Sequence, residues 1–296
     1  MIRALIRGRS RCAPLPLRAL PLLALPLLAG CDAARLGVMN AAGPVAETQR
    51  HLYLILAIVL IFIAGPVLIL TPIFAWRYRL SDKRHIYRPT WDFSWGVEAL
   101  IWLPPTGIVL GLSVLLWTYT HRLDPYRPVA GSGPPLVIQA VALDWKWLFI
   151  YPDQRIATID QMAIPVGRPV RIVLTSGTVM QSLLIPRLAG QIYAMAGMRT
   201  ELNLAASRAG VFRGENTQYN GTGFARQSFD VLALSPDGYR RWLARVHAAA
   251  TPLDRMAYAQ LFKQTTPPDP VFYSAAPAGL FDTILARDLP PKATRR

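Results

Sequence analysis

The chain has 296 residues, and 52% of them are hydrophobic while only 17% carry a charge. Soluble globular proteins carry about 25% charged residues, so this composition excludes an ordinary cytosolic enzyme and a disordered protein. Two cysteines exclude a disulfide-rich scaffold and a four-cysteine metal site. The net charge of +15 gathers in the N-terminal stretch and in one short loop, without a basic stripe interleaved with aromatics, which argues against nucleic acid as a partner.

Residues 1–30 have the features of a bacterial lipoprotein signal peptide. Arginines precede an apolar stretch at residues 19–28, which is too short to span a membrane. The small residues before Cys31 resemble a lipobox, so cleavage there would leave Cys31 as the acylated N-terminus. The alternative is ordinary signal cleavage, with Cys31 as a bystander. The Asp32 that follows resembles the inner-membrane retention signal of some bacterial lipoproteins.

Two apolar runs predict transmembrane helices at about residues 52–76 and 95–120, within an N-terminal membrane segment covering residues 31–120. The first run has no charge, and the second has only Glu98. At about 1.5 Å per residue, the first helix would reach roughly 38 Å, more than the hydrocarbon core of about 30 Å. The alternative, two buried helices of a soluble domain, is disfavoured by this length and near-absence of charge.

The loop between the two runs predicts the orientation in the bilayer. This loop contains two acidic residues, Asp82 and Asp92, and five basic ones. The basic residues are Arg77, Arg79, Lys83, Arg84 and Arg88. The positive-inside rule places this loop in the cytoplasm. The chain after His121 would then be periplasmic, on a protein held in the bacterial inner membrane.

Residues 121–235 predict an all-β domain, and residues 236–296 predict a helical extension. A linker rich in proline and glycine, residues 125–135, is followed by short strands separated by turn residues, which favours a sandwich or Greek-key barrel. The predicted strands are 136–142, 145–151, 169–175, 182–185, 199–205, 211–214 and 228–234. Apolar residues at helical spacing then predict helices at 239–250 and 253–264, and a short segment at 280–286 ends the pattern.

Two spans with this orientation, then Asp144-Trp145-Lys146-Trp147 and a β-domain, resemble subunit II of the haem–copper respiratory oxidases. The resemblance implies a membrane-anchored α+β protein with a cupredoxin-like Greek-key domain. In the cytochrome c oxidase members, that domain holds a dinuclear copper centre with the pattern H-S-x-x-x-P, then C-x-E-x-C-x₃-H-x₂-M. This sequence keeps the spacing, but all six ligand positions are changed. They are occupied by Gln181, Asn216, Gln218, Asn220, Phe224 and Gln227.

The changed positions predict that this subunit holds no metal. A copper centre of this kind needs thiolate and imidazole ligands, which amides and a phenyl ring cannot replace. Residues 130–235 contain neither cysteine nor histidine, so no nearby residue can substitute. The alternative is a cytochrome c oxidase subunit with an unusual copper site.

The segments 145–152 and 185–198, the lipobox and the C-terminal extension resemble subunit II of the bo-type ubiquinol oxidases. The resemblance implies a complex that oxidises membrane quinol, reduces O₂ to water and moves protons outward. Haems, copper and the quinol site would lie in the large subunit I. The partners would be subunit I, the smaller membrane subunits and the lipid bilayer, without cytochrome c. The alternative is a free-standing membrane lipoprotein that acts in assembly or binding.

Three further side chains are candidates for a role in this subunit. An ionisable residue inside a span usually has a function or a partner. The resemblance places Glu98 at the mouth of a proton channel, while the alternative is a first-turn glutamate that favours the helix dipole. Trp145 and Trp147 lie where the copper-containing branch has its electron-entry aromatics. Here we expect them to be packing anchors at the subunit interface, with a redox role as the alternative.

Overall fold

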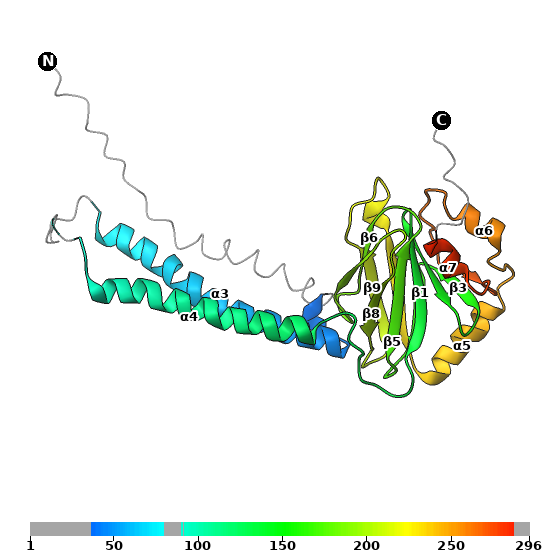
Figure 1. The fold of residues 1–296 in the computed structure, drawn as a ribbon, viewed down its shortest axis with the longest axis horizontal. Helices are drawn as coiled ribbons and strands as arrows, with labels where there is room; N and C mark the ends of the chain where they lie inside the picture. The colour runs from blue at the N-terminus through cyan, green and yellow to red at the C-terminus, as the bar shows by residue number, and fades with distance from the viewer. Residues whose placement is uncertain (1–36, 80–89, 91, 287–296) are drawn as a thin grey trace, which may run out of the picture.

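The computed structural model describes residues 37–79, 90 and 92–286. Two long helices lie side by side and extend from one side of a β-sandwich, and short helices cover the opposite side of that sandwich (Figure 1). The predictions for residues 1–30 and for Cys31 lie outside the described residues. So do most of the basic side chains of the connecting loop.

The two long helices are α3 (Pro44–Arg77) and α4 (Trp95–Arg122), and both are long and apolar enough to cross a membrane. Four prolines lie inside them, two in each helix, without ending either one, as is tolerated in membrane helices. Helix α3 begins eight residues before the predicted span. The polar residues 47–51 interrupt the apolar pattern between Ala46 and Leu52, so the start of this helix lies outside the run from which the span was predicted.

The start of α3 is fixed to the β-sandwich. The backbone N–H of Ala42 donates to the carbonyl of Arg187 at 2.7 Å, and the Ala42 carbonyl accepts from the N–H of Ser207 at 2.7 Å. Gly43 is required here, since a Cβ at this position would lie 2.3 Å from the carbonyl oxygen of Ala205. The short helix η2 (Val38–Asn40) precedes this contact. Residues before the hairpin therefore contribute to the packing of the exported domain.

Two sheets form the sandwich. The first has the strand order β11-β3-β2-β1-β5-β8, and the second has the order β4-β10-β9-β6-β7. Parallel pairs join β1 to β5 and β10 to β4, and the other pairs are antiparallel. The main apolar core lies between the sheets. The strands before the extension are β1 (Leu136–Leu143), β2 (Lys146–Tyr151), β3 (Ile156–Ile159), β4 (Gln161–Pro165), β5 (Val170–Ser176), β6 (Gln181–Leu184), β7 (Gln191–Ala194), β8 (Thr200–Leu204), β9 (Gly210–Asn216) and β10 (Ser228–Leu234).

All seven predicted strands are confirmed, with ends that differ by no more than two residues. The short strands β3, β4 and β7 were not predicted. Strands β3 and β4 are separated only by Asp160, which adopts the left-handed φ of 57° and turns the chain from one sheet to the other. Such a corner has no glycine or proline to indicate it in the sequence.

The C-terminal extension contains α5 (Pro236–His247), α6 (Arg255–Gln260), strand β11 (Val271–Tyr273) and α7 (Leu280–Leu285). The predicted helical extension is confirmed by α5, α6 and α7. It also contains one strand that was not predicted, β11, which pairs antiparallel with β3 and completes the first sheet. A second apolar core forms where the extension covers the outer face of this sheet, with Tyr258, Leu280 and Phe281 among its buried side chains. The extension is thus an integral layer of the exported domain (Figure 1).

Candidate functional site

The fold brings the six former ligand positions to one end of the sandwich. Strand β6 begins at Gln181 and pairs with β9, whose last residue is Asn216. Strand β9 also pairs with β10, so the connection between them carries the remaining positions on a loop that returns beside β6. This loop holds Gln218 and Asn220, the short helix η3 (Phe224–Arg226), and Gln227 immediately before β10.

Four of these side chains form one hydrogen-bonded amide cluster, which we define as Gln181, Asn216, Asn220 and Gln227. Gln227 lies at its centre: its Nε2 donates to Gln181 Oε1 at 2.6 Å. Its Oε1 accepts from Asn216 Nδ2 at 3.0 Å and from Asn220 Nδ2 at 2.7 Å. Gln181, Asn216 and Gln227 are buried, each at most 4% exposed. These bonds pair most of the buried amide groups, with Asn220 Oδ1 left without a partner among the described residues, and they hold one arrangement of the loop.

The amide cluster also bonds to the backbone around it. Gln181 Nε2 donates to the carbonyl of Leu143, at the end of β1, at 2.9 Å. Asn216 Oδ1 accepts the backbone N–H groups of Ser182 and Gln218, each at 3.0 Å. The cluster therefore ties β1, β6 and the β9–β10 loop together across the two sheets.

The other two former ligand positions lie beside the cluster. Gln218 joins through its backbone, since its carbonyl accepts from Asn216 Nδ2 at 2.8 Å. The Phe224 ring packs edge-on against Tyr219, with ring centroids 5.7 Å apart, and is partly exposed. Neither a glutamine amide nor a phenyl ring is a ligand that copper prefers.

The donor set does not fit the dinuclear copper centre of the cytochrome c oxidase branch. Neutral amides and a phenyl ring stand where that centre has thiolates, imidazoles and a thioether, the soft and intermediate ligands that copper prefers. In the part of the chain that the structure describes, no three His, Cys, Asp or Glu side chains come together to hold a metal. The chain thus keeps the spacing of the copper-binding loop but has amides and a phenyl ring at the ligand positions.

Trp145 packs on the loop that carries the amide cluster. Its ring lies against Gly223, where a Cβ would approach the ring to 2.1 Å, and its Nε1 donates to the carbonyl of Asn220 at 3.3 Å. Its backbone has a left-handed φ of 66°, in the turn between β1 and β2. The side chain keeps part of its surface exposed, so a contact with another subunit remains a prediction for this residue.

The expectation that Trp147 is an interface anchor is wrong. Its side chain is 0% exposed, lies in the core between the sheets and packs against Phe229 with ring centroids 5.8 Å apart. Side chains alternate along a strand, so Trp147 faces inward once the turn at residues 144–145 has placed Lys146 on the opposite face.

Glu98 lies in the first turn of α4, as predicted. Its Oε2 accepts a hydrogen bond from Trp102 Nε1, one turn further along the helix, at 3.1 Å. The indole N–H of Trp102 occupies one acceptor position of the Glu98 carboxylate. The other lone pairs of this carboxylate can still accept a proton or a hydrogen bond. The spacing of four residues between Glu98 and Trp102 was the signal in the sequence that could have predicted this contact.

Known proteins resemble the chain along most of its length. A family model described as "Cytochrome C oxidase subunit II, periplasmic domain" matches residues 147–231, and another described as "COX Aromatic Rich Motif" matches residues 247–290. The cytochrome bo(3) ubiquinol oxidase subunit 2 of Pseudomonas aeruginosa is 41% identical over 258 residues, covering 87% of this chain and 77% of that protein. The ubiquinol oxidase subunit 2 of Acetobacter aceti is 41% identical over 261 residues, covering 88% and 84%. The chain belongs to the quinol oxidase subunit 2 family.

Membership in this family confirms the prediction of a respiratory oxidase subunit, and it disfavours the alternative of a free-standing membrane lipoprotein. The chain is thus a membrane-anchored subunit of an oxidoreductase complex, and its β-domain corresponds to the periplasmic domain of the family.

A buried lysine of this subunit 2 fastens the C-terminal extension, and the sequence did not predict this role. Lys146 is 1% exposed, and its Nζ donates to the carbonyls of Leu261 and Lys263 at 3.1 and 2.7 Å and to Thr265 Oγ1 at 2.8 Å. Burial lowers the pKa of this ammonium group, and the nearby Asp160 and Asp144 oppose that effect. Because a buried ammonium needs partners, the segment that follows α6 is bound to the start of β2.

Asp160 links the β3–β4 corner to β2. Its Oδ1 accepts the N–H of Trp147 at 2.7 Å, its own N–H donates to the Trp147 carbonyl at 2.9 Å, and its carbonyl accepts from the N–H of Asp230. Burial raises the pKa of this carboxyl group to about 7, although the Trp147 N–H and the charge of Lys146 both act to lower it.

We expect Asp160→Asn to reduce the loss of stability at alkaline pH. The folded protein binds this proton more tightly than the unfolded chain, so its contribution is complete below about pH 4 and is lost as the pH rises through 7. The contribution corresponds to about 2–3 kcal/mol between pH 5 and pH 8. Asparagine removes this titration, keeps the Oδ1 acceptor and tolerates a left-handed φ.

The measurement is the free energy of unfolding of the full chain in detergent, from denaturant titrations at pH 5 and pH 8. The variant should show the smaller difference between the two pH values. Asp153→Asn, at an exposed position, is the matched control and should behave as the parent. An unchanged pH difference in Asp160→Asn would contradict the assignment.

Proposed function

We propose that this chain is the structural, non-redox subunit of a complex that oxidises two quinols with one O₂, giving two quinones and two waters, and translocates protons. The amide cluster carries the proposal. Where the copper-containing branch receives electrons, this subunit has neutral amides that cannot change oxidation state. Electrons would therefore enter from quinol within the bilayer, and no cytochrome c would dock on this domain.

The partners follow from this role. The haems, the copper and the quinol site belong to subunit I in our proposal, and α3 and α4 pack against it together with the smaller membrane subunits. The periplasmic domain caps the outer face of subunit I, and the exposed part of Trp145 is one of its contacts. Lipidation at Cys31, after removal of residues 1–30, adds a second attachment to the inner membrane.

Glu98 is the proposed site of proton entry. The positive loop before α4 places this helix start at the cytoplasmic side, where protons must be taken up. The carboxylate accepts from Trp102 Nε1 and is only partly exposed. A carboxylate held by one donor can still accept and release a proton, which is what a relay requires.

The test measures quinol-dependent oxygen uptake by the complex, purified through a tag on this chain and normalised to haem. Glu98→Gln should slow turnover several-fold, because the amide keeps size and hydrogen bonding but cannot carry a proton. Glu98→Asp should be milder. Trp102→Phe, the matched control, removes the indole donor, keeps the carboxylate and should retain most activity.

The same preparation separates two failures. Haem that does not co-purify with the tagged chain would contradict the proposed partnership with subunit I. Full activity in Glu98→Gln, with normal haem content, would contradict proton entry and reduce Glu98 to a charge that favours the helix dipole.

A further inference from the structure

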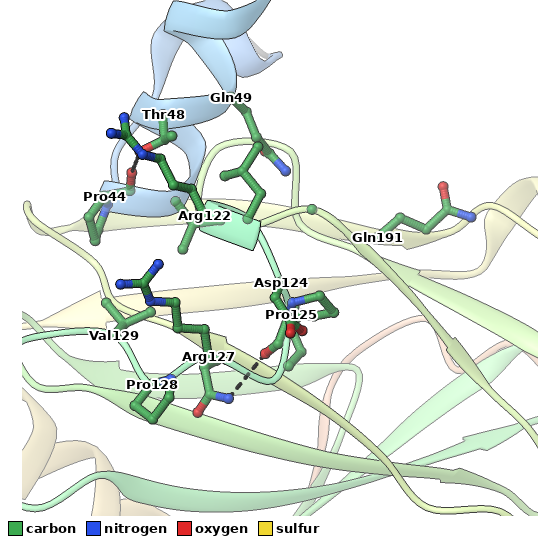
Figure 2. Close-up of a pocket in the computed structure, with 15 residues that line it drawn as sticks. Pro44, Thr48, Gln49, Arg122, Asp124, Pro125, Arg127, Pro128, Val129 and Gln191 are labelled. Atoms are coloured by element: carbon green, nitrogen blue, oxygen red, sulfur yellow. Dashed lines mark hydrogen bonds between the residues drawn. The ribbon is translucent and has the colours of Figure 1, made fainter. Parts of the chain in front are cut away.

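An open pocket with a mixed polar and apolar lining lies where the membrane hairpin meets the β-sandwich. It has a volume of about 260 Å³ and is lined by the first turns of α3, the end of α4, the linker that follows it and the edges of β7 and β8. Figure 2 shows the side chains around it, among them Thr48, Gln49, Arg122, Asp124 and Arg127. None of the residues that line this pocket belongs to the amide cluster.

The pocket lies at the level of the phospholipid headgroups. Gln49 is three residues before Leu52, the first residue of the apolar run in α3, and Arg122 is two residues after the apolar run of α4, which ends at residue 120. Three or four residues of helix rise about 5–6 Å. The headgroup layer occupies about 5–8 Å on each side of the hydrocarbon core, so the two depths coincide.

The charges in the pocket are unbalanced. Within residues 37–79, 90 and 92–286, neither guanidinium group, of Arg122 or of Arg127, has an ion-pair or hydrogen-bond partner. Both extend toward the same side of the pocket in Figure 2, and the carboxylate of Asp124 lies on the other side, where it accepts the N–H of Tyr126 at 2.9 Å. The described part of the chain therefore supplies two cations at one wall without an anion between them.

Neutral donors complete the lining. The amide of Gln49 lies over Gly190, where a Cβ would come within 2.6 Å of its Nε2. Asn203 Nδ2 donates to the Pro125 carbonyl at 3.1 Å and fixes the linker that carries Arg127. The two arginines, both exposed, thus reach the pocket from different segments: Arg122 ends α4, and Arg127 lies in the linker that Asn203 holds.

We propose that this pocket binds the phosphodiester group of an outer-leaflet phospholipid, with Arg122 and Arg127 as its ligands. Guanidinium groups pair with phosphate oxygens through two parallel hydrogen bonds, which makes arginine well suited to this anion. The helices below the pocket present exposed apolar side chains such as Tyr53 and Leu116, along which acyl chains can lie. Such a lipid would fasten the hairpin to the periplasmic domain at the membrane surface.

The test uses the full chain purified in detergent, with dioleoyl phosphatidylglycerol added at a fixed ratio, and counts retained lipid by native mass spectrometry. The parent should retain one lipid. The double variant Arg122→Gln with Arg127→Gln should retain at least fivefold less. The control, Arg226→Gln with Arg245→Gln, makes the same change in net charge at exposed positions away from the pocket and should match the parent.

Two additional arms distinguish direct phosphate binding from general charge attraction, and a lipid from a free phosphate ester. Arg122→Lys with Arg127→Lys keeps both charges without the planar fork, and it should retain an intermediate amount of lipid if the arginines bind phosphate directly. Glycerophosphate at the concentration of the lipid should not displace it, and displacement would overturn the lipid in favour of a free phosphate ester. Equal retention by the parent and the double glutamine variant would overturn the site itself.

Discussion

Replacement of all six former ligand positions is expected to convert the amide cluster into a dinuclear copper site. The changes are Gln181→His, Asn216→Cys, Gln218→Glu, Asn220→Cys, Phe224→His and Gln227→Met. Four of these side chains already converge: Gln227 bonds to Gln181, Asn216 and Asn220 at 2.6–3.0 Å. The backbone that presents them therefore has the arrangement that a cluster of ligands needs. The sixfold variant should bind two copper ions per chain and show visible thiolate-to-copper absorption.

The control is a fourfold variant that keeps Asn216 and Asn220 and so lacks both bridging thiolates. It should give no such absorption, because imidazole and thioether alone do not supply the soft bridging ligands. Metal analysis and a visible spectrum after addition of copper and reductant decide the result. A stoichiometric coloured centre in the unaltered chain would contradict the non-redox role that we propose.

Truncation of Trp147 is expected to destabilise the periplasmic domain strongly. The side chain is fully buried between the sheets beside Phe229, and removal of a buried tryptophan costs about 3–5 kcal/mol. For a domain of this size, that loss lowers the midpoint of thermal unfolding by roughly 10 °C. The measurement is the near-ultraviolet circular dichroism of the full chain in detergent as a function of temperature.

Trp145→Phe is the matched control for this experiment. It keeps an aromatic ring against Gly223 and loses only the hydrogen bond to the Asn220 carbonyl, so it should change stability by about 1 kcal/mol or less. A Trp147→Ala variant that unfolds at the parental temperature but no longer co-purifies with haem would restore Trp147 as an interface residue.

The membrane hairpin and most of the sandwich could be predicted because their signals are local. An uninterrupted apolar run indicates a span, and alternating side chains between turn residues indicate a strand. The start of α3 could not be predicted in this way, since Ala42, just before the helix, is fixed by distant backbone contacts with Arg187 and Ser207. Strand β11 is similar: three residues become a strand only because β3 offers an unpaired edge.

The convergence of the former ligand positions could be predicted from a preserved spacing, but their bonding could not. Spacing places residues on a loop, whereas the choice of donor and acceptor among four amides depends on side-chain orientation. Trp147 shows the same limit. Its neighbour Trp145 lies in a turn with φ of 66°, and this turn decides which of the two indoles faces the core.

The docking of the C-terminal extension has a consequence for biosynthesis. The chain is made from its N-terminus, so Lys146 lacks the carbonyls of Leu261 and Lys263 until the segment after α6 has emerged. Strand β3 remains an unpaired edge until β11 has emerged, and the outer face of the first sheet is not fully covered until α7 follows. Unprotected edges and apolar faces are targets for aggregation and proteolysis. We therefore expect a chain that lacks the extension to aggregate or to be degraded. A chain with the docked extension presents a closed surface for assembly.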